Sequence, residues 1–275
     1  MPSEKFPGIE TFHRGDRYGV LDAGAQVLEW TPTGRNPVLW VSPLAVFGPG
    51  IAVRGGVPVV FPWFGGGPSG HRSPSHGFAR TAAWRRTSVV NDVATSGRLE
   101  VRHELDASRQ DSDPFGAELV AVFTPREVEV SLVVTNTGDA DFSYEEALHT
   151  YLAVSDVARI SLEGLDGCGY VDKVNGGDQV QAGPVRFTGE VDRLYDHTGD
   201  VVVDDPDWSR RIRVSKEGSA ITVVWNPGAA RGASMSDVAQ HWAGFVCVEA
   251  ANTGDRMVTI PSGGTHTLAQ TLQLV

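Results

Sequence analysis

Apolar and polar residues alternate with a period of two along much of this chain. The clearest run extends from Glu127 to Val134, where acidic or small residues occupy every second position and aliphatic residues occupy the others. This pattern is typical of a β-strand with one buried face and one solvated face. Further runs of strand length cover residues 99–105, 119–123, 142–154, 245–250, 257–260 and 267–274.

Turn and helix signals indicate how these runs are connected. Residues 211–215 and 220–225 both have strand character, and a turn signal that ends at Gly218 separates them, which predicts a hairpin. Helical periodicity is scarce, and the main helix signal is at Ser236 and Asp237, which are suited to cap a short helix through Trp242. Because strand follows strand with short turns between them, we expect an all-β sandwich of antiparallel sheets.

Composition places the chain among ordinary globular proteins. It has 275 residues, of which 41% are hydrophobic and 21% are charged, so it can bury a large core. Large sandwiches often exceed the usual domain size, and we expect residues 1–275 to form a single domain. The formal net charge of -11 argues against a nucleic-acid partner, because such a protein needs a basic surface to displace counterions. An anionic ligand would therefore require a local cluster of cations.

The sequence contains no signal for export or membrane insertion. Its N-terminal segment MPSEKFPGIE has acidic residues and no apolar core, and no apolar run is long enough to span a bilayer. We therefore expect a cytoplasmic protein without a membrane partner. Cys168 and Cys247 are the only cysteines, and because such thiols are normally kept reduced, we expect no disulfide.

Two arginines stand among apolar and glycine residues. Arg54 precedes two glycines and an apolar run, and Arg80 ends the segment that begins at Ser75. A planar guanidinium in such surroundings is suited to hold an anion such as a phosphate through two hydrogen bonds. Each arginine could equally pair with one of the 34 acidic residues, and the sequence leaves both interpretations open.

His149 and Glu249 each interrupt an apolar run. Strand alternation places His149 on the same face as Ala147 and Tyr151. Glu249 is the only ionisable carboxylate of residues 245–252, and burying it is costly unless it is paired or used. A hydrogen-bonded core histidine and a strand-end glutamate that reaches solvent are the alternative interpretations.

Sequence motifs for several other chemistries are absent. There is no His-Glu-x-x-His or paired-cysteine metal motif, no Gly-x-Ser-x-Gly elbow and no dinucleotide fingerprint. We therefore expect neither a metal nor an organic cofactor. A histidine, a carboxylate and arginines remain, and this set suits proton transfer on a small anionic substrate.

Six segments along the chain carry a recognisable pattern. They are Arg54-Gly-Gly-Val-Pro with Phe61-Pro-Trp-Phe-Gly, His76-Gly-Phe-Ala-Arg80, Ala147-Leu-His149-Thr-Tyr, Glu190-Val-Asp192-Arg-Leu-Tyr195, Val224-Trp-Asn-Pro227 and Val246-Cys-Val-Glu249. These segments resemble the glucose-6-phosphate 1-epimerases, the hexose-6-phosphate branch of the aldose 1-epimerase (galactose mutarotase-like) superfamily. The resemblance covers nearly the whole chain, and the segments follow one another in the order found in the family.

The resemblance implies both a fold and a reaction. The implied fold is a galactose mutarotase-like β-supersandwich with a sugar bound on a concave sheet face. The implied reaction is the cofactor-independent interconversion of the α and β anomers of an aldohexose 6-phosphate. Carried over position by position, His149 looks like the catalytic acid and Glu249 looks like the catalytic base.

The resemblance also implies a set of substrate-binding residues. Arg54, Arg80 and Asp192 look like members of this set, and His76 belongs to the same pocket segment. The family often has glutamine directly before the His-Gly-Phe-Ala-Arg run, where this chain has Ser75. We include Ser75 among the candidates for substrate contact.

Two further departures and two rival functions are relevant. Relatives often have a tryptophan where this chain has Gly228, and a lysine nearby, for which Arg231 is the candidate substitute.

An aldose 1-epimerase for unphosphorylated sugars would use the same acid–base pair without requiring both arginines. A non-catalytic carbohydrate-binding module would not require that pair. We expect a small-molecule sugar phosphate as the only partner, and a monomer.

Overall fold

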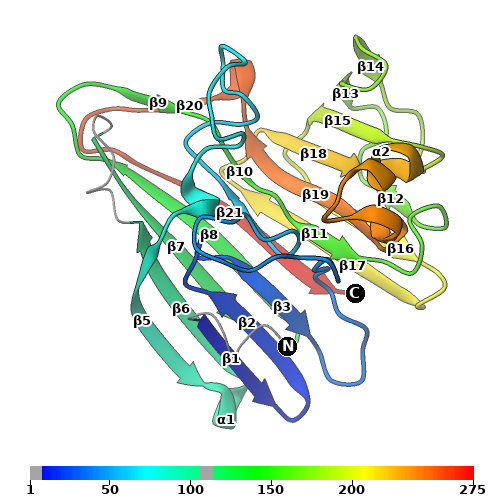
Figure 1. Cartoon of the computed structure of the whole chain (residues 1–275), viewed down its shortest axis with the longest axis horizontal. Coiled ribbons are helices and arrows are strands. Elements are labelled where there is room, and N and C mark those ends of the chain that lie inside the picture. Colours follow the sequence, from blue (N-terminus) through cyan, green and yellow to red (C-terminus); the bar gives the residue numbers. More distant parts are fainter. Residues whose placement is uncertain (1–7, 106–113) are drawn as a thin grey trace.

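Two eight-stranded sheets dominate the computed structural model, which describes residues 8–105 and 114–275. Residues 1–7 lie outside this range. They belong to the N-terminal segment from which we expect no export signal. The sheets stack on one another (Figure 1). Every pairing between two strands of the described residues is antiparallel. The expected all-β class is confirmed.

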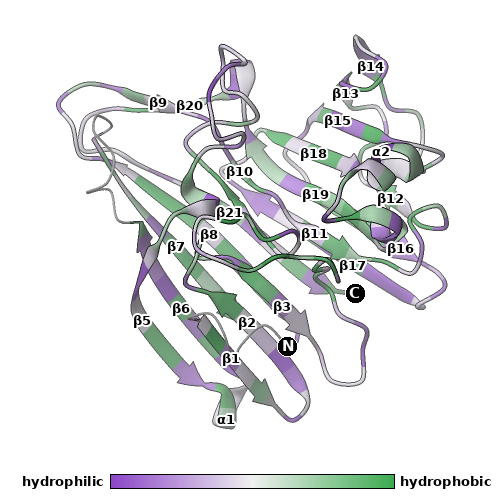
Figure 2. Cartoon of the chain, viewed as in Figure 1, coloured by the Kyte–Doolittle hydropathy of each residue, from purple (hydrophilic) through white to green (hydrophobic). Residues whose placement is uncertain are grey.

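The sheet that we call the back sheet contains most of the strands with clear alternation. Strands β7 and β6 have buried residues at every second position, and Figure 2 shows hydrophobic and hydrophilic residues following one another along β6. In spatial order the strands are β12 (Ser161–Glu163), β16 (Val201–Asp205), β17 (Arg210–Glu217), β21 (Thr265–Leu274), β8 (Glu127–Asn136), β7 (Phe115–Phe123), β6 (Arg98–Leu105) and β5 (Trp84–Asp92).

The opposite sheet, which we call the site sheet, is buried on both faces at its centre. All eight residues of β19 are buried. Val246, Val248 and Ala250 belong to the main core between the sheets, whereas Cys247 packs in a separate aromatic cluster on the other face. In spatial order the strands are β14 (Asp178–Val180), β13 (Gly169–Asp172), β15 (Val191–Asp196), β18 (Ile221–Asn226), β19 (Phe245–Asn252), β10 (Glu146–Leu148) and β4 (Val59–Val60), and β11 (Tyr151–Ala153) also pairs with β19.

Smaller elements flank these two sheets. Strands β1 (Gly8–His13), β2 (Asp16–Leu21) and β3 (Val27–Thr31) form a three-stranded sheet, and β9 (Phe142–Tyr144) pairs with β20 (Val258–Ile260). None of the helices in the described ranges combines the length and the apolar character needed to cross a membrane. They are α1 (Val93–Ser96) and α2 (Gly228–Ser234), with 3₁₀ turns η1 (Ala79–Thr81), η3 (Ala239–Gly244) and η4 (Gly254–Arg256).

The predicted hairpin at Gly218 is wrong. Strand β17 pairs with β16 and β21 in the back sheet, while β18 pairs with β15 and β19 in the site sheet. The chain therefore crosses from one sheet to the other at this turn. Gly218 has φ of 66°, and a Cβ atom there would lie 2.0 Å from the carbonyl oxygen of Thr267, so the close approach of the two sheets requires glycine.

Two other local predictions also need correction. The single extended run expected for residues 142–154 is divided into β9, β10 and β11, because Glu145 and residues 149–150 leave the strand pairing. The short helix expected from a cap at Ser236 and Asp237 through Trp242 is present as the 3₁₀ turn η3, but it begins only at Ala239. The carboxylate of Asp237 forms an ion pair with Arg54 and does not cap a helix.

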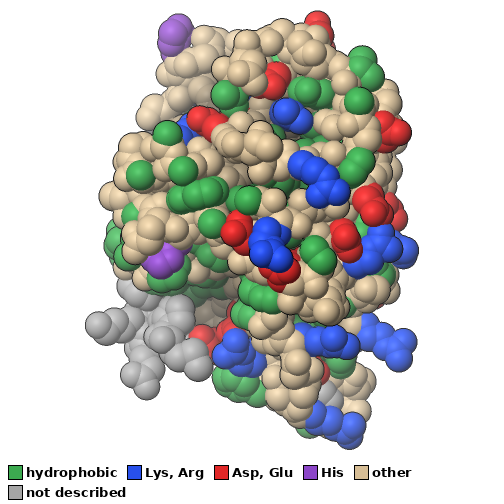
Figure 3. Space-filling view, turned by 90° about the vertical axis from the view of Figure 1, so that its right-hand side faces the viewer, with side chains coloured by type: hydrophobic (Ala, Val, Ile, Leu, Met, Phe, Trp, Pro, Cys, Tyr) green, Lys and Arg blue, Asp and Glu red, His purple; other side chains and the backbone are tan. Residues whose placement is uncertain are grey.

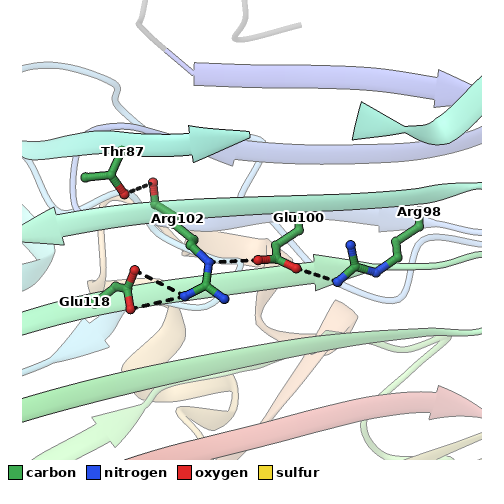
Figure 4. Close-up of polar contacts among 5 residues, drawn as sticks. All are labelled: Thr87, Arg98, Glu100, Arg102 and Glu118. Carbon is green, nitrogen blue, oxygen red and sulfur yellow. Dashed lines mark hydrogen bonds and ion pairs between the residues drawn. The ribbon is translucent and has the colours of Figure 1, made fainter. Parts of the chain in front are cut away.

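Charged side chains compensate one another locally on the outer surface. On the solvent face of the back sheet, Arg102 donates hydrogen bonds to Glu100 at 2.8 Å and to Glu118 at 3.3 Å, and Arg98 pairs with Glu100 (Figure 4). Figure 3 shows acidic and basic side chains close to one another on a further face. Because such exposed pairs are solvated, each contributes at most about 1 kcal/mol to stability.

Substitutions at two adjacent residues of β7 should therefore have very different effects on the free energy of unfolding. Leu119 is completely buried in the main core, whereas Glu118 belongs to the surface network. We expect Leu119→Ala to lower the free energy of unfolding by about 2–5 kcal/mol through lost burial and a cavity. Glu118→Ala should lower it by no more than about 1 kcal/mol. Urea unfolding measures both, and equal losses would contradict the assignment of the two faces.

Candidate active site

A cavity of about 380 Å³ opens on the face of the site sheet opposite the main core. All seven residues predicted from the sequence line it: Arg54, Ser75, His76, Arg80, His149, Asp192 and Glu249. They come from strands, loops and turns that are far apart in the sequence. The cavity is also lined by Phe64, Gly65, Lys173, Val223, Trp225, Arg231 and Met235.

The most buried ionisable side chains of the cavity are those of His149 and Glu249. The Nδ1 atom of His149 lies 3.4 Å from Oε1 of Glu249, and the two residues are only 7% and 1% exposed. Neither His149 Nδ1 nor Glu249 Oε2 has a hydrogen-bond partner among the described residues. The alternative of a solvated strand-end glutamate is therefore wrong, and both groups have capacity left for a ligand.

Strand geometry fixes this pair. Glu249 lies at the centre of β19, where Val223 of β18 is its direct neighbour across the sheet. His149 lies in the short link between β10 and β11, and its N–H donates a hydrogen bond to the carbonyl oxygen of Pro58 at 3.0 Å. The link allows the imidazole to project from a position where the chain has left the regular strand pairing.

Aromatic rings hold the imidazole of His149 in place. Its ring stacks on Tyr151 with a centroid distance of 4.9 Å and an interplanar angle of 7°, and it meets the edge of Trp225 at 5.9 Å. Such contacts restrict the rotation of the histidine. The side chain is therefore oriented before any ligand arrives.

Burial shifts the pKa values of the pair in opposite directions. Desolvation, followed by the negative charge of Asp192, raises the pKa of Glu249 well above its ordinary value. Desolvation, followed by the neighbouring His76 and Arg80, lowers the pKa of His149 well below 6.5. An ionised Glu249 is therefore a stronger base, and a protonated His149 a stronger acid, than the free side chains, and both properties favour proton transfer at this site.

His76 lies beside this pair in a neutral form. Its ring centroid is 5.7 Å from that of His149, and its Nδ1 accepts a hydrogen bond from the N–H of Gly65 at 3.2 Å. Burial, with the positive charges of Arg80, Lys173 and Arg54, lowers the pKa of His76 to about 3. Because Nδ1 is an acceptor, the ring hydrogen of His76 lies on Nε2.

The backbone of this segment depends on Gly77. His76 and Gly77 both have positive φ, at 67° and 72°. A Cβ atom on Gly77 would lie 2.0 Å from the carbonyl oxygen of Phe61, so no other residue fits without displacing the segment. Gly77 thus helps to set the positions of His76, which precedes it, and of Arg80, which lies three residues further along the chain.

The two predicted arginines differ in how they are paired. Nε of Arg54 donates to Asp237 at 2.8 Å and its Nη1 donates to the hydroxyl of Tyr151 at 2.8 Å, so the alternative of carboxylate pairing applies to Arg54. Arg80 has no ion pair within the described residues. Its Nη2 donates to the carbonyl oxygen of Ser75 at 2.7 Å, and its buried Nε has no partner there.

The remaining charged residues form the wall near β15. Burial raises the pKa of Asp192, while the positive charges of Lys173 and Arg231 oppose this shift. Arg231 forms an ion pair with Glu190. The sequence did not single out Lys173, since a lysine in a turn gives no signal of its own. Gly228 does not line the cavity.

One group of side chains has donors suited to a metal ion. His149, Cys247 and Glu249 offer one nitrogen, one sulfur and one oxygen, all within 4.8 Å of one another. These donor types match those that bind zinc. Cys247 is a free, buried thiol, and burial is the main cause that raises its pKa well above 9.0, which opposes the thiolate form needed for coordination.

Comparison with known proteins identifies the family. A sequence model described as aldose 1-epimerase matches residues 13–273. The chain belongs to this family. Its fold also resembles that of "a galactose mutarotase-like protein from Lactobacillus casei ATCC 334", with a TM-score of 0.72, 14% identity and coverage of 98% of this chain and 100% of the other. The expected galactose mutarotase-like β-supersandwich is confirmed.

Two other proteins are more similar to this chain than the Lactobacillus casei protein is. The Escherichia coli K12 protein named "Putative glucose-6-phosphate 1-epimerase" is 34% identical over 259 residues, which cover 91% of this chain and 84% of the relative. The crystal structure of "a putative mutarotase (YeaD) from Salmonella typhimurium" superposes with a TM-score of 0.87 at 30% identity, and covers 98% of this chain and 90% of the other. Both comparisons extend over most of the chain.

The environments of two histidines in this epimerase predict pKa shifts in opposite directions. His76 should remain neutral down to about pH 3. The interaction of His266 with the buried carboxylate of Glu146, at 2.9 Å, raises the pKa of His266 above 6.5. NMR titration of the imidazole ¹⁵N shifts measures both values. A pKa near 6.5 for His76 would show that its ring is solvated and contradict its placement in the cavity.

Proposed function

We propose that this epimerase interconverts the α and β anomers of an aldohexose 6-phosphate, with His149 and Glu249 as its acid–base pair. The single observation that supports this function most directly is the 3.4 Å approach of these two buried groups in a cavity with a cationic wall. Family membership supports sugar anomer interconversion. The names of the relatives motivate the choice of a 6-phosphate.

The reaction that we propose needs two proton transfers. Glu249 removes the proton of the C1 hydroxyl while His149 gives a proton to the ring oxygen, so the C1–O5 bond breaks and an aldehyde forms. Rotation about the C1–C2 bond presents the other face of the carbonyl, and the ring closes as the two residues exchange roles. Each positioned group contributes roughly 10²–10⁴ to the rate. No electron transfer occurs, so we expect no organic cofactor.

The other cavity residues divide between the sugar and its phosphate. Asp192 is an acceptor for the hydroxyl groups of the ring, because a carboxylate would repel a phosphate. Arg54 and Arg80 supply guanidinium donors suited to an anionic group. Binding of the phosphate at a distance from C1 helps to position the reacting end against His149 and Glu249.

The wild-type protein provides the direct test. Exchange spectroscopy by NMR on equilibrated glucose 6-phosphate should show interconversion of its anomers well above the uncatalysed rate. The value of kcat/KM should be higher for glucose 6-phosphate than for glucose. A preference for unphosphorylated glucose or galactose would favour an aldose 1-epimerase for neutral sugars. Binding of glucose 6-phosphate without faster exchange would instead indicate a carbohydrate-binding module.

Substitution of either His149 or Glu249 should abolish catalysed anomer exchange while the fold is retained. Glu249→Gln removes the proton acceptor and His149→Asn removes the proton donor, so each should lower kcat by about 10²–10⁴. Matched controls are Glu217→Gln and His71→Asn, which make the same changes at exposed positions outside the cavity. Circular dichroism checks the fold of all four variants. Near-normal exchange in either cavity variant would overturn the assignment.

A further inference from the structure

Four cations line the cavity, and they differ in whether a carboxylate already neutralises them. Arg54 forms an ion pair with Asp237, and Arg231 forms one with Glu190. Arg80 is largely enclosed, and one of its nitrogens is used by the carbonyl oxygen of Ser75. Lys173 has no ion pair and no side-chain hydrogen bond within residues 8–105 and 114–275. Its ammonium group instead lies over the ring of Phe64, with Nζ 4.9 Å from the centroid.

The backbone around Lys173 is held rigidly although the side chain is exposed. The N–H of Lys173 donates to the carbonyl oxygen of Asp192 at 2.9 Å, which joins the turn to the cavity wall. The carboxylate of Asp172 accepts hydrogen bonds from the N–H groups of Val174 and Asn175, both at 2.9 Å. Because Asp172 is used within the turn, it does not neutralise the neighbouring lysine.

The charge of Lys173 acts on the floor of the cavity. Burial is the main cause of the pKa shifts of Glu249 and His76, and the positive charge of Lys173 lowers the pKa of both. Lys173 thus lies at the exposed rim, within electrostatic reach of the buried acid–base pair. Because Lys173, His149 and Glu249 line the same cavity, one ligand can contact both the rim and the buried pair.

We propose that Lys173 binds the phosphate group of the substrate, together with Arg80, and determines the preference for phosphorylated over unphosphorylated sugars. This inference rests on the proposed function of the cavity. An ammonium group on a flexible stem can follow a phosphate at the rim, while the enclosed Arg80 offers a fixed donor beside it. The contact with Phe64 holds the ammonium group over the cavity before the phosphate arrives.

Loss of this charge should affect one substrate much more than the other. We expect Lys173→Met to raise the KM for glucose 6-phosphate by about 10- to 100-fold, the size expected for loss of a charged hydrogen bond. The kcat for both sugars and the KM for glucose should change by less than about threefold. Lys173→Arg, which keeps the charge, should retain most of the preference.

Arg231→Met is the matched control, because it removes a cation at the same cavity that already pairs with Glu190. Its effect on the phosphate preference should be at least about fivefold smaller than that of Lys173→Met. Equal losses in the two variants would show that the general potential of the cavity sets the preference, and would overturn the role of Lys173. That role is also overturned if Lys173→Met raises the KM for both sugars alike.

The outcomes separate this inference from the function on which it rests. If the wild type shows no preference for glucose 6-phosphate over glucose, the proposed function fails. If the wild type shows the preference and Lys173→Met keeps it, only the role of Lys173 fails. The wild-type protein also allows a direct test. Acetylation of Lys173 by acetic anhydride can be followed by peptide mass spectrometry, and glucose 6-phosphate should slow it more than glucose does. Equal protection by the two sugars would overturn the proposal.

Discussion

Burial of one carboxylate on the central strand of a sheet is the constraint on which the site depends. Glu249 is 1% exposed, and an ionised carboxylate at such a depth is costly without compensation. The positive charges of Arg80 and Lys173 supply part of it, but desolvation and the charge of Asp192 outweigh them, so the pKa of Glu249 is raised. Its Oε2 atom has no hydrogen-bond partner among the described residues, so Glu249 has the proton affinity and the free acceptor capacity that the proposed general base requires.

The position of this carboxylate follows from the two faces of β19. Val248 and Ala250 pack into the core against the back sheet, so the strand is fixed from behind. Glu145, which directly precedes β10 of the site sheet, accepts hydrogen bonds through its carboxylate from the N–H groups of Phe64 and Gly254, at 3.0 and 2.8 Å. The segment that carries Phe64, which lines the cavity, is thereby joined to the same sheet as Glu249.

Much of the fold could be predicted from the sequence, because period-two alternation reports directly which residues of a strand are buried. The same pattern does not report which strands pair, and the hairpin predicted at Gly218 was wrong for that reason. The seven candidate residues lie together, but their selection relied on family resemblance as well as on Glu249 within an apolar run. Lys173 and the pairing of Asp237 with Arg54 had no local signal, since both depend on contacts between distant segments.

The location of Lys173 in a turn has a consequence for how this family can diversify. His149 and Glu249 are tied to the sheet core, where a substitution disturbs packing on two sides. Lys173, Ser75 and Arg231 instead lie on the rim, where the backbone belongs to turns and a short helix and the side chains are exposed. Under the proposed function, replacement of single rim residues would change the substrate range while the acid–base pair in the sheet core is inherited intact.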